Sequence, residues 1–277
     1  MALSVRPLTI NIGAEVSGID LRDPSDADIK DIEAALLEHL VLFFRDQPLT
    51  PAQHVALGRR FGGLHLHSTA DTHPEHEEII LLENDERRPP NIDAWHTDVT
   101  MDAEPPMGSI LRAVDVPAVG GDTIWASMYA AYDALGPAMQ AMLKELVAVH
   151  HYPDYFRTGI LRQTDGYARL ERYDRDHPPV EHPVVRRHPV TGRYGLFVNS
   201  SFTKYIKGMG RKEGAALLRQ LYDHIATRPE FQVRFKWERD SIAFWDNRCT
   251  QHYAVADYHP RHRLMHRVTI AGDRPVC

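Results

Sequence analysis

Apolar residues recur with helical spacing in several stretches of the chain. Between residues 26 and 39, the apolar positions Ile29, Ile32 and Leu36 fall on one face of a helix that Ser25 or Asp26 can cap. Residues 50–53 read Thr-Pro-Ala-Gln, a capping box that predicts a second helix ending near residues 61–63. Further helices are expected at about residues 127–135, 137–147 and 212–226.

Shorter apolar runs predict the strands. Residues 41–44 are continuously apolar, which indicates a buried strand, and residues 8–20 alternate loosely, which indicates short strands. The segments 184–188 and 194–198 flank a Thr-Gly turn and predict a hairpin. Because the strands are short and spread to the end of the chain, we expect a mixed α and β fold, with a β-sandwich or barrel core and flanking helices. Other strands are expected at 79–82, 109–114, 123–125, 231–237, 242–245 and 264–270.

Residues 151–180 depart from these patterns. They show little periodicity and many charges. Such a stretch is either a solvated linker between domains or a lid over a site. A chain of 277 residues can form one large or two small domains. We expect a single domain over residues 1–277 with an exposed insert or lid at about 151–180.

Composition excludes several classes of partner. The net charge is −6 with acids and bases interspersed, so we expect no nucleic-acid partner. No apolar run approaches the roughly 18 residues that cross a bilayer, so we expect no membrane association. Two cysteines cannot build a disulfide framework, and the N-terminus lacks a secretory signal. We therefore expect a cytoplasmic protein.

Candidate metal ligands begin with His96 and Asp98, which point the same way on an extended segment. Alone this pair means little, because among seventeen histidines His73 and His76 are also followed by an acid two positions later. His252, beyond the predicted strand 242–245, offers a third ligand. Two histidines and one carboxylate leave three positions open, which suits Fe(II) with a bidentate cosubstrate and O₂. Zinc, and hence a hydrolase, is the alternative.

Two arginines predict an anion site. Arg263 and Arg267 are four residues apart at the start of the last predicted strand, so they share a face. An arginine fork pairs naturally with a planar carboxylate, and Thr123 can add a hydroxyl to the same anion. A metal-binding sensor or storage protein would need the metal ligands but no such arginine pair, so an enzyme is favoured.

Together these motifs resemble the taurine dioxygenase (TauD/TfdA) family of Fe(II)- and 2-oxoglutarate-dependent dioxygenases. The resemblance runs almost from end to end, and its most specific parts lie at residues 95–100, 120–123, 245–252 and 263–267. It implies a double-stranded β-helix (jelly roll) core with flanking helices, and, by family analogy, a homo-oligomer.

The resemblance also implies a role for individual residues. His96, Asp98 and His252 match the iron ligands, and no catalytic residue beyond them is implied. The distal carboxylate of 2-oxoglutarate would be held by Thr123 and Arg263. The anionic head of the substrate would be held by Arg267, with His67, the backbone N–H of Val99 and the pocket aromatic Phe202 as further contacts.

The chain departs from the taurine enzymes at two positions. Ala70 and Ile92 stand where those enzymes carry a tyrosine and an asparagine that seat the amine of taurine. Neither side chain can hydrogen-bond an amine, so we expect a substrate with a more apolar body. The implied reaction hydroxylates a small anion of the taurine, alkyl sulfonate or alkyl sulfate type, giving sulfite or sulfate, an aldehyde, succinate and CO₂. An aryloxyalkanoate or another carboxylate is the alternative substrate.

Overall fold

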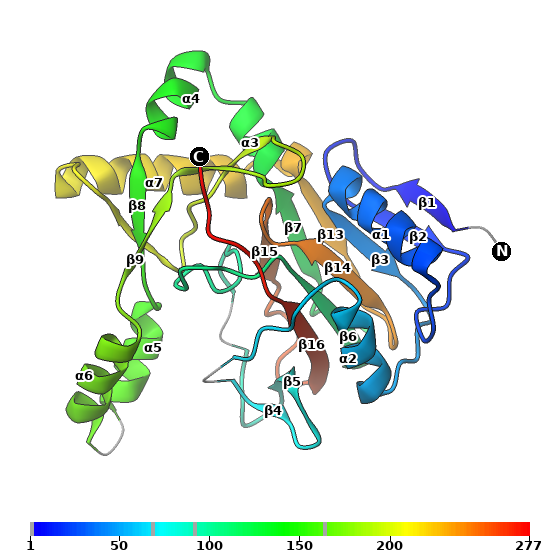
Figure 1. Ribbon diagram of the computed structural model, residues 1–277. Helices are drawn as coiled ribbons and strands as arrows, with labels where there is room; N and C mark the ends of the chain where they lie inside the picture. The colour runs from blue at the N-terminus through cyan, green and yellow to red at the C-terminus, as the bar shows by residue number, and fades with distance from the viewer. Residues whose placement is uncertain (1–2, 68–69, 91–92, 163–164) are drawn as a thin grey trace.

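The computed structural model describes residues 3–67, 70–90, 93–162 and 165–277 and shows a mixed α and β architecture (Figure 1). Its largest element is an eight-stranded sheet in the order β1-β2-β3-β14-β6-β16-β5-β4. Neighbouring strands are antiparallel except for the parallel pair β2 and β3. The strands are β1 Ser4–Pro7, β2 Ala14–Ser17, β3 Val41–Phe44, β4 Thr72–His73, β5 His76–Asn84, β6 Gly108–Asp115, β14 Ile242–Asp246 and β16 Arg263–Ile270.

Three smaller sheets complete the β structure. One has the order β13-β7-β15, a second the order β12-β8-β9, and the third is the hairpin of β10 and β11. This hairpin confirms the expectation for residues 184–198. The strands are β7 Thr123–Ser127, β8 Val147–His150, β9 Val180–Pro183, β10 Val185–Arg187, β11 Tyr194–Leu196, β12 Thr203–Ile206, β13 Gln232–Phe235 and β15 Thr250–Ala254.

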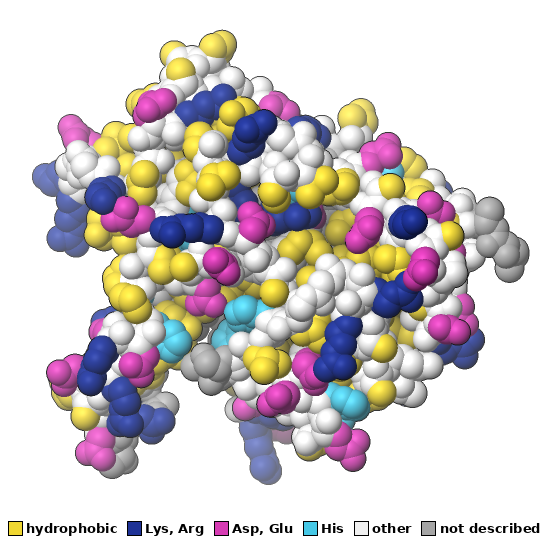
Figure 2. All heavy atoms as spheres, viewed as in Figure 1, with side chains coloured by type: hydrophobic (Ala, Val, Ile, Leu, Met, Phe, Trp, Pro, Cys, Tyr) yellow, Lys and Arg dark blue, Asp and Glu magenta, His cyan; other side chains and the backbone are white. Residues whose placement is uncertain are grey.

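Most helices pack around these sheets, whereas one pair projects beyond the ends of β8 and β9, at the lower left of the view (Figure 1, Figure 2). Both predicted N-terminal caps are present, because Ser25 and Thr50 each accept a hydrogen bond from a backbone N–H three residues on and complete a capping box. The helices are α1 Asp26–His39, α2 Pro51–Arg59, α3 Met128–Asp133, α4 Pro137–Lys144, α5 Asp154–Leu161, α6 Gly166–Asp176 and α7 Arg211–Ala226, with a short 3₁₀ turn at Pro229–Phe231.

Strand β3 shows how the large sheet is buried on both faces. Its side chains alternate, and Val41 and Phe43 join a cluster that includes Trp125 of β7. Leu42 and Phe44 join a different cluster, which contains the buried face of α1. The large sheet therefore faces β13-β7-β15 on one side and α1 on the other.

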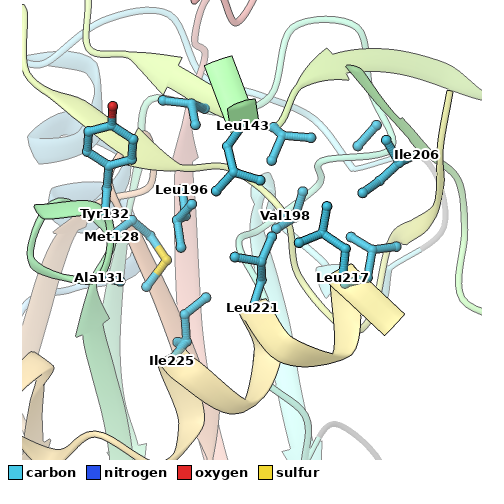
Figure 3. Packing of buried hydrophobic residues seen from close by; sticks show 14 of the residues in the cluster. Met128, Ala131, Tyr132, Leu143, Leu196, Val198, Ile206, Leu217, Leu221 and Ile225 are labelled. Atoms are coloured by element: carbon cyan, nitrogen blue, oxygen red, sulfur yellow. The ribbon is translucent and has the colours of Figure 1, made fainter. Parts of the chain in front are cut away.

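A separate apolar cluster lies around α7 (Figure 3). Helix α7 buries Leu217, Leu221 and Ile225 at helical spacing. These side chains pack with residues of α3, α4 and β11, among them Leu143 and Leu196. Helix α7 is thereby fixed beside the sheet β12-β8-β9, away from the large sheet.

Several expected elements differ from the structure. The strand expected over residues 8–20 is confined to β2, and β1 precedes that range. The helix expected to reach Val147 ends at Lys144, because a new strand, β8, begins at Val147. Residues 151–180 contain the helices α5 and α6, and β15 was not expected as a strand. No helix in the described ranges is long and apolar enough to span a bilayer.

Candidate active site

One cavity of about 440 Å³ brings the predicted site residues together. Its walls come from β5, β6, β14 and β16 of the large sheet and from β7 and β15 of the opposing sheet. His96, Asp98, His252, Thr123 and Arg263 line it. The remaining predicted residues that line it are Arg267, His67, Val99, Phe202 and Ala70, whereas Ile92 lies outside the described residues.

The three candidate metal ligands converge on one point. Nε2 of His96 lies 3.7 Å, and Nε2 of His252 lies 3.8 Å, from Oδ1 of Asp98. The two histidine backbones exchange hydrogen bonds of 3.0 and 2.8 Å, which holds the segment before Asp98 against β15. Ligand atoms about 2.0–2.2 Å from one ion lie closer together than this, so small side-chain movements would close the triad on a metal.

The protonation of the triad suits a cation. Nδ1 of His96 lies 2.8 Å from the carbonyl of Ala94, so Nδ1 carries the proton and Nε2 has a free lone pair. Burial lowers the pKa of His96 and lowers that of His252 to about 3. Burial opposes ionisation of Asp98, yet the positive charge of Arg267 and the hydrogen bond from Ser109 help to hold its pKa well below the usual range. Neutral imidazoles and an ionised carboxylate are a metal-binding donor set.

Asn247 holds Asp98 in place, and sequence reasoning missed it. Its Oδ1 accepts from the backbone N–H of Asp98 at 2.8 Å, and its Nδ2 donates to the carbonyls of Asp98 at 3.0 Å and Pro106 at 3.1 Å. Ser109 adds a bond from Oγ to Oδ2 of Asp98 at 3.2 Å. The only feature of the sequence that could have indicated this role is the position of Asn247 inside the 245–252 motif.

Thr123 and Arg263 occupy the same cavity, as predicted. Arg263 is only 6% exposed, and in the part of the chain that the structure describes its Nε has no hydrogen-bond partner and no carboxylate pairs with it. Gly121 makes room for it, because a Cβ there would lie 3.3 Å from both Cδ and Nε of Arg263. The φ of +73° at Gly121 also favours glycine. A buried guanidinium without a carboxylate partner is suited to an anionic ligand.

Arg267 lies closer to the triad. Its Nη1 donates to Oδ1 of Asp98 at 2.9 Å, and its Nε has no hydrogen-bond partner within the described ranges. His67 lines the same part of the cavity, and burial together with the Arg267 charge lowers its pKa to about 4. A neutral imidazole and a guanidinium both offer N–H donors to an anion there.

An apolar wall lies next to this anion site. Val99 and Met101 pack with Tyr152, and Phe156 of α5 and Phe202 join this cluster. All five residues line the cavity. Val99 has a φ of 55°, in the left-handed region, so the chain turns sharply directly after Asp98. Through Tyr152 and Phe156, the segment at residues 151–180 contributes to the cavity wall.

A second buried cluster, His188, Asp246 and Cys249, also offers three ligand atoms within 4.8 Å. Nδ1 of His188 accepts from the backbone N–H groups of Val190 and Thr191, so its Nε2 carries the proton and donates to Asp246 at 3.0 Å. Arg248 pairs with the same carboxylate at 2.6 Å. These bonds satisfy the cluster without a metal, and we assign it a structural role.

Comparison with known proteins agrees with this geometry. The family model described as "Taurine catabolism dioxygenase TauD, TfdA family" matches residues 4–269. An α-ketoglutarate-dependent sulfate ester dioxygenase from Pseudomonas putida is 38% identical, over 100% of this chain and 92% of that protein.

Two solved structures are also similar. A taurine dioxygenase from Burkholderia xenovorans superposes with a TM-score of 0.84 at 39% identity, covering 100% of this chain and 91% of that one. AAD-2 in complex with Mn(II) and N-oxalylglycine has a TM-score of 0.84 at 32% identity, covering 100% of both chains. The chain belongs to the TauD/TfdA family of α-ketoglutarate-dependent dioxygenases.

Proposed function

We propose that this protein is an Fe(II)- and 2-oxoglutarate-dependent dioxygenase that hydroxylates an organic sulfate or sulfonate with an apolar body. The observation that carries the proposal is the joint placement of a histidine–carboxylate triad, two arginines and an apolar wall in one cavity. Each part corresponds to one component of the reaction, namely metal, cosubstrate and substrate.

His96, Asp98 and His252 would hold the iron. Two imidazoles and one carboxylate leave coordination positions for the cosubstrate and O₂. The bound metal, with these two reactants, supplies the oxidation of a substrate C–H bond. The contribution of the chain is to keep the Nε2 lone pair of His96 free and to orient Asp98 through Asn247 and Ser109.

Arg263 and Thr123 would bind the distal carboxylate of 2-oxoglutarate. Because the guanidinium of Arg263 is buried without a carboxylate partner, an anionic ligand that pairs with it stabilises it. Gly121 and Tyr258 fix its position, because they pack against its aliphatic stem and its charged end. This end of the site would orient the cosubstrate before reaction.

Arg267 and His67 would hold the sulfate or sulfonate, with the backbone N–H of Val99 as a third contact. Hydroxylation of the carbon beside that group gives a product that collapses to an aldehyde and sulfate or sulfite. Ala70 lines the cavity and offers no hydrogen bond to an amine, which favours a substrate without one. From the sequence alone, we propose that Ile92 likewise offers no hydrogen bond to an amine.

The body of the substrate would lie against the apolar wall. Phe156 and Phe202 contribute aromatic area, and Met101 is an adaptable apolar contact. We propose that residues 151–180 act as a lid, since α5 carries Phe156 into the cavity wall. Within a single domain over residues 1–277, the eight-stranded sheet and β13-β7-β15 would form the two halves of a jelly roll.

A substrate panel tests the proposal. Purified protein with Fe(II), ascorbate, 2-oxoglutarate and O₂ is supplied with taurine, linear alkyl sulfates, alkyl sulfonates or aryloxyalkanoates. Succinate formation and sulfate or sulfite release are measured for each. We expect alkyl sulfates or sulfonates of intermediate chain length to have the highest kcat/KM. A clear preference for taurine would contradict the role of the apolar wall, and a preference for aryloxyalkanoates would select the alternative substrate class.

A further inference from the structure

Thr123 makes a hydrogen bond that determines how its hydroxyl can be used. Nε1 of Trp237 donates to Oγ1 of Thr123 at 2.9 Å, and both residues are only 3% exposed. An indole N–H is a donor and never an acceptor. Oγ1 of Thr123 is therefore the acceptor in this bond.

A threonine hydroxyl has one proton, which the bond to Trp237 leaves unused. Oγ1 of Thr123 donates to no other group within the described part of the chain. Thr123 lines the cavity that also contains Arg263. The hydroxyl proton is thus available to an acceptor in the cavity, next to the buried guanidinium.

Trp237 itself stands behind the cavity wall and is firmly packed. Its ring lies 5.1 Å from that of Phe235 in an edge-on arrangement and 6.2 Å from that of Trp125. Phe235 in turn stacks on Phe43 at 4.1 Å. Strand β13, which ends at Phe235, pairs with β7 so that Phe235 is opposite Thr123. The indole therefore has little freedom to turn its N–H away from Thr123.

We propose that Trp237 is a positioning residue that makes Thr123 a hydrogen-bond donor to the distal carboxylate of the cosubstrate. This inference rests on the proposed function of Thr123 and Arg263. Without Trp237, the hydroxyl could equally present a lone pair to the carboxylate, which would repel it. With Trp237, one lone pair is occupied and the proton faces the anion before the cosubstrate arrives.

Binding measurements on a double-mutant cycle test the proposal. The variants are Trp237→Phe, which keeps an aromatic ring but removes the donor, Thr123→Val, and the double variant. The affinity of each for 2-oxoglutarate is measured anaerobically with Mn(II) by calorimetry. We expect Trp237→Phe to weaken binding roughly 2- to 10-fold and Thr123→Val roughly 10-fold or more. In the Thr123→Val background, Trp237→Phe should change affinity less than 2-fold.

A cosubstrate analogue distinguishes an effect of Trp237 on the orientation of the Thr123 hydroxyl from an effect on the packing of the site. 2-Oxovalerate has the same keto-acid end but no distal carboxylate, so Trp237→Phe should leave its affinity unchanged. Equal losses for 2-oxovalerate and 2-oxoglutarate, or additive losses in the cycle, would overturn the inference. Thermal unfolding without ligand identifies a variant that fails to fold, and Trp237→Leu, which also lacks a donor, then replaces Trp237→Phe. If the wild-type protein binds 2-oxoglutarate but does not turn it over, the proposed function is contradicted and the role of Trp237 is not. If the wild-type protein does not bind 2-oxoglutarate, both the proposed function and the role of Trp237 are contradicted.

Discussion

His182 makes the stability of the site loop depend on pH. Its Nε2 donates to the carbonyls of Thr100 and Asp102, both at 3.0 Å, and so anchors the segment that follows Asp98 and Val99. Its Nδ1 is buried and has no hydrogen-bond partner among the residues that the structure describes. Protonation would place a charge and an unsatisfied donor at Nδ1, and burial accordingly lowers the pKa of His182 to about 4.

The size of the effect follows from the linkage between protonation of His182 and unfolding. The unfolded chain takes up this proton below the ordinary pKa of 6.5, whereas the folded protein takes it up only below about 4. The stabilisation is therefore complete above pH 6.5 and is lost as the pH falls towards 4. At 1.36 kcal/mol per pH unit, His182 alone should remove about 2 kcal/mol from the free energy of unfolding between pH 7.5 and pH 5.

Urea unfolding followed by circular dichroism, at pH 7.5 and at pH 5.0, measures this effect. The matched variant is His182→Gln, because a glutamine amide can still donate to a carbonyl but does not titrate. Other buried histidines, such as His54 with a pKa of about 3, titrate in wild type and variant alike and cancel in the comparison. We expect the loss of stability on acidification to be smaller in the variant by about 2 kcal/mol. Equal losses in the two proteins would refute the reasoning.

Three further substitutions address the cavity. Gly121→Ala places a Cβ 3.2 Å from Tyr258 and 3.3 Å from Arg263, at a φ of +73°. We therefore expect the free energy of unfolding to fall by about 1–2 kcal/mol and 2-oxoglutarate to bind more weakly. Thermal unfolding with and without 2-oxoglutarate measures both effects. Phe156→Ala should lower kcat/KM for long alkyl sulfates roughly 10-fold while leaving taurine nearly unchanged, and a uniform loss would contradict its place in the apolar wall. Arg267→Lys should raise the KM for the sulfate substrate at least 10-fold and change the KM for 2-oxoglutarate little. A large rise in the KM for 2-oxoglutarate alone would show that Arg267, and not Arg263, binds the cosubstrate.

The chemistry of this site was predictable because it resides in a few polar residues at characteristic spacings. His96 and Asp98 are two apart on an extended segment, and the structure brings both to His252. Thr123, Arg263 and Arg267 were also expected in one place, and the cavity contains all three. Strands β7 and β16, which carry Thr123, Arg263 and Arg267, have apolar patterns, and so their positions could be predicted.

The missed features depend on distant contacts. Asn247 holds the backbone of Asp98 from the turn after β14, and no periodic pattern in the sequence signals this bond. Helix α6 was missed because six of its eleven residues are charged, so the segment has the composition of a solvated loop although its few apolar residues have helical spacing. Strand β15 contains the polar residues Thr250, Gln251 and His252, which are buried by pairing with β7. Polar strands of this kind are stabilised by their neighbours more than by their own composition.

Product analysis with an alkyl sulfate tests the central claim most directly. An oxidative cleavage gives an aldehyde with sulfate and one succinate for each turnover, whereas a zinc-type hydrolysis gives the alcohol with sulfate and consumes no 2-oxoglutarate. We expect aldehyde and succinate in equal amounts, only when Fe(II), 2-oxoglutarate and O₂ are all present, and neither product from the Asp98→Ala variant. Release of the alcohol in the absence of 2-oxoglutarate would contradict the account.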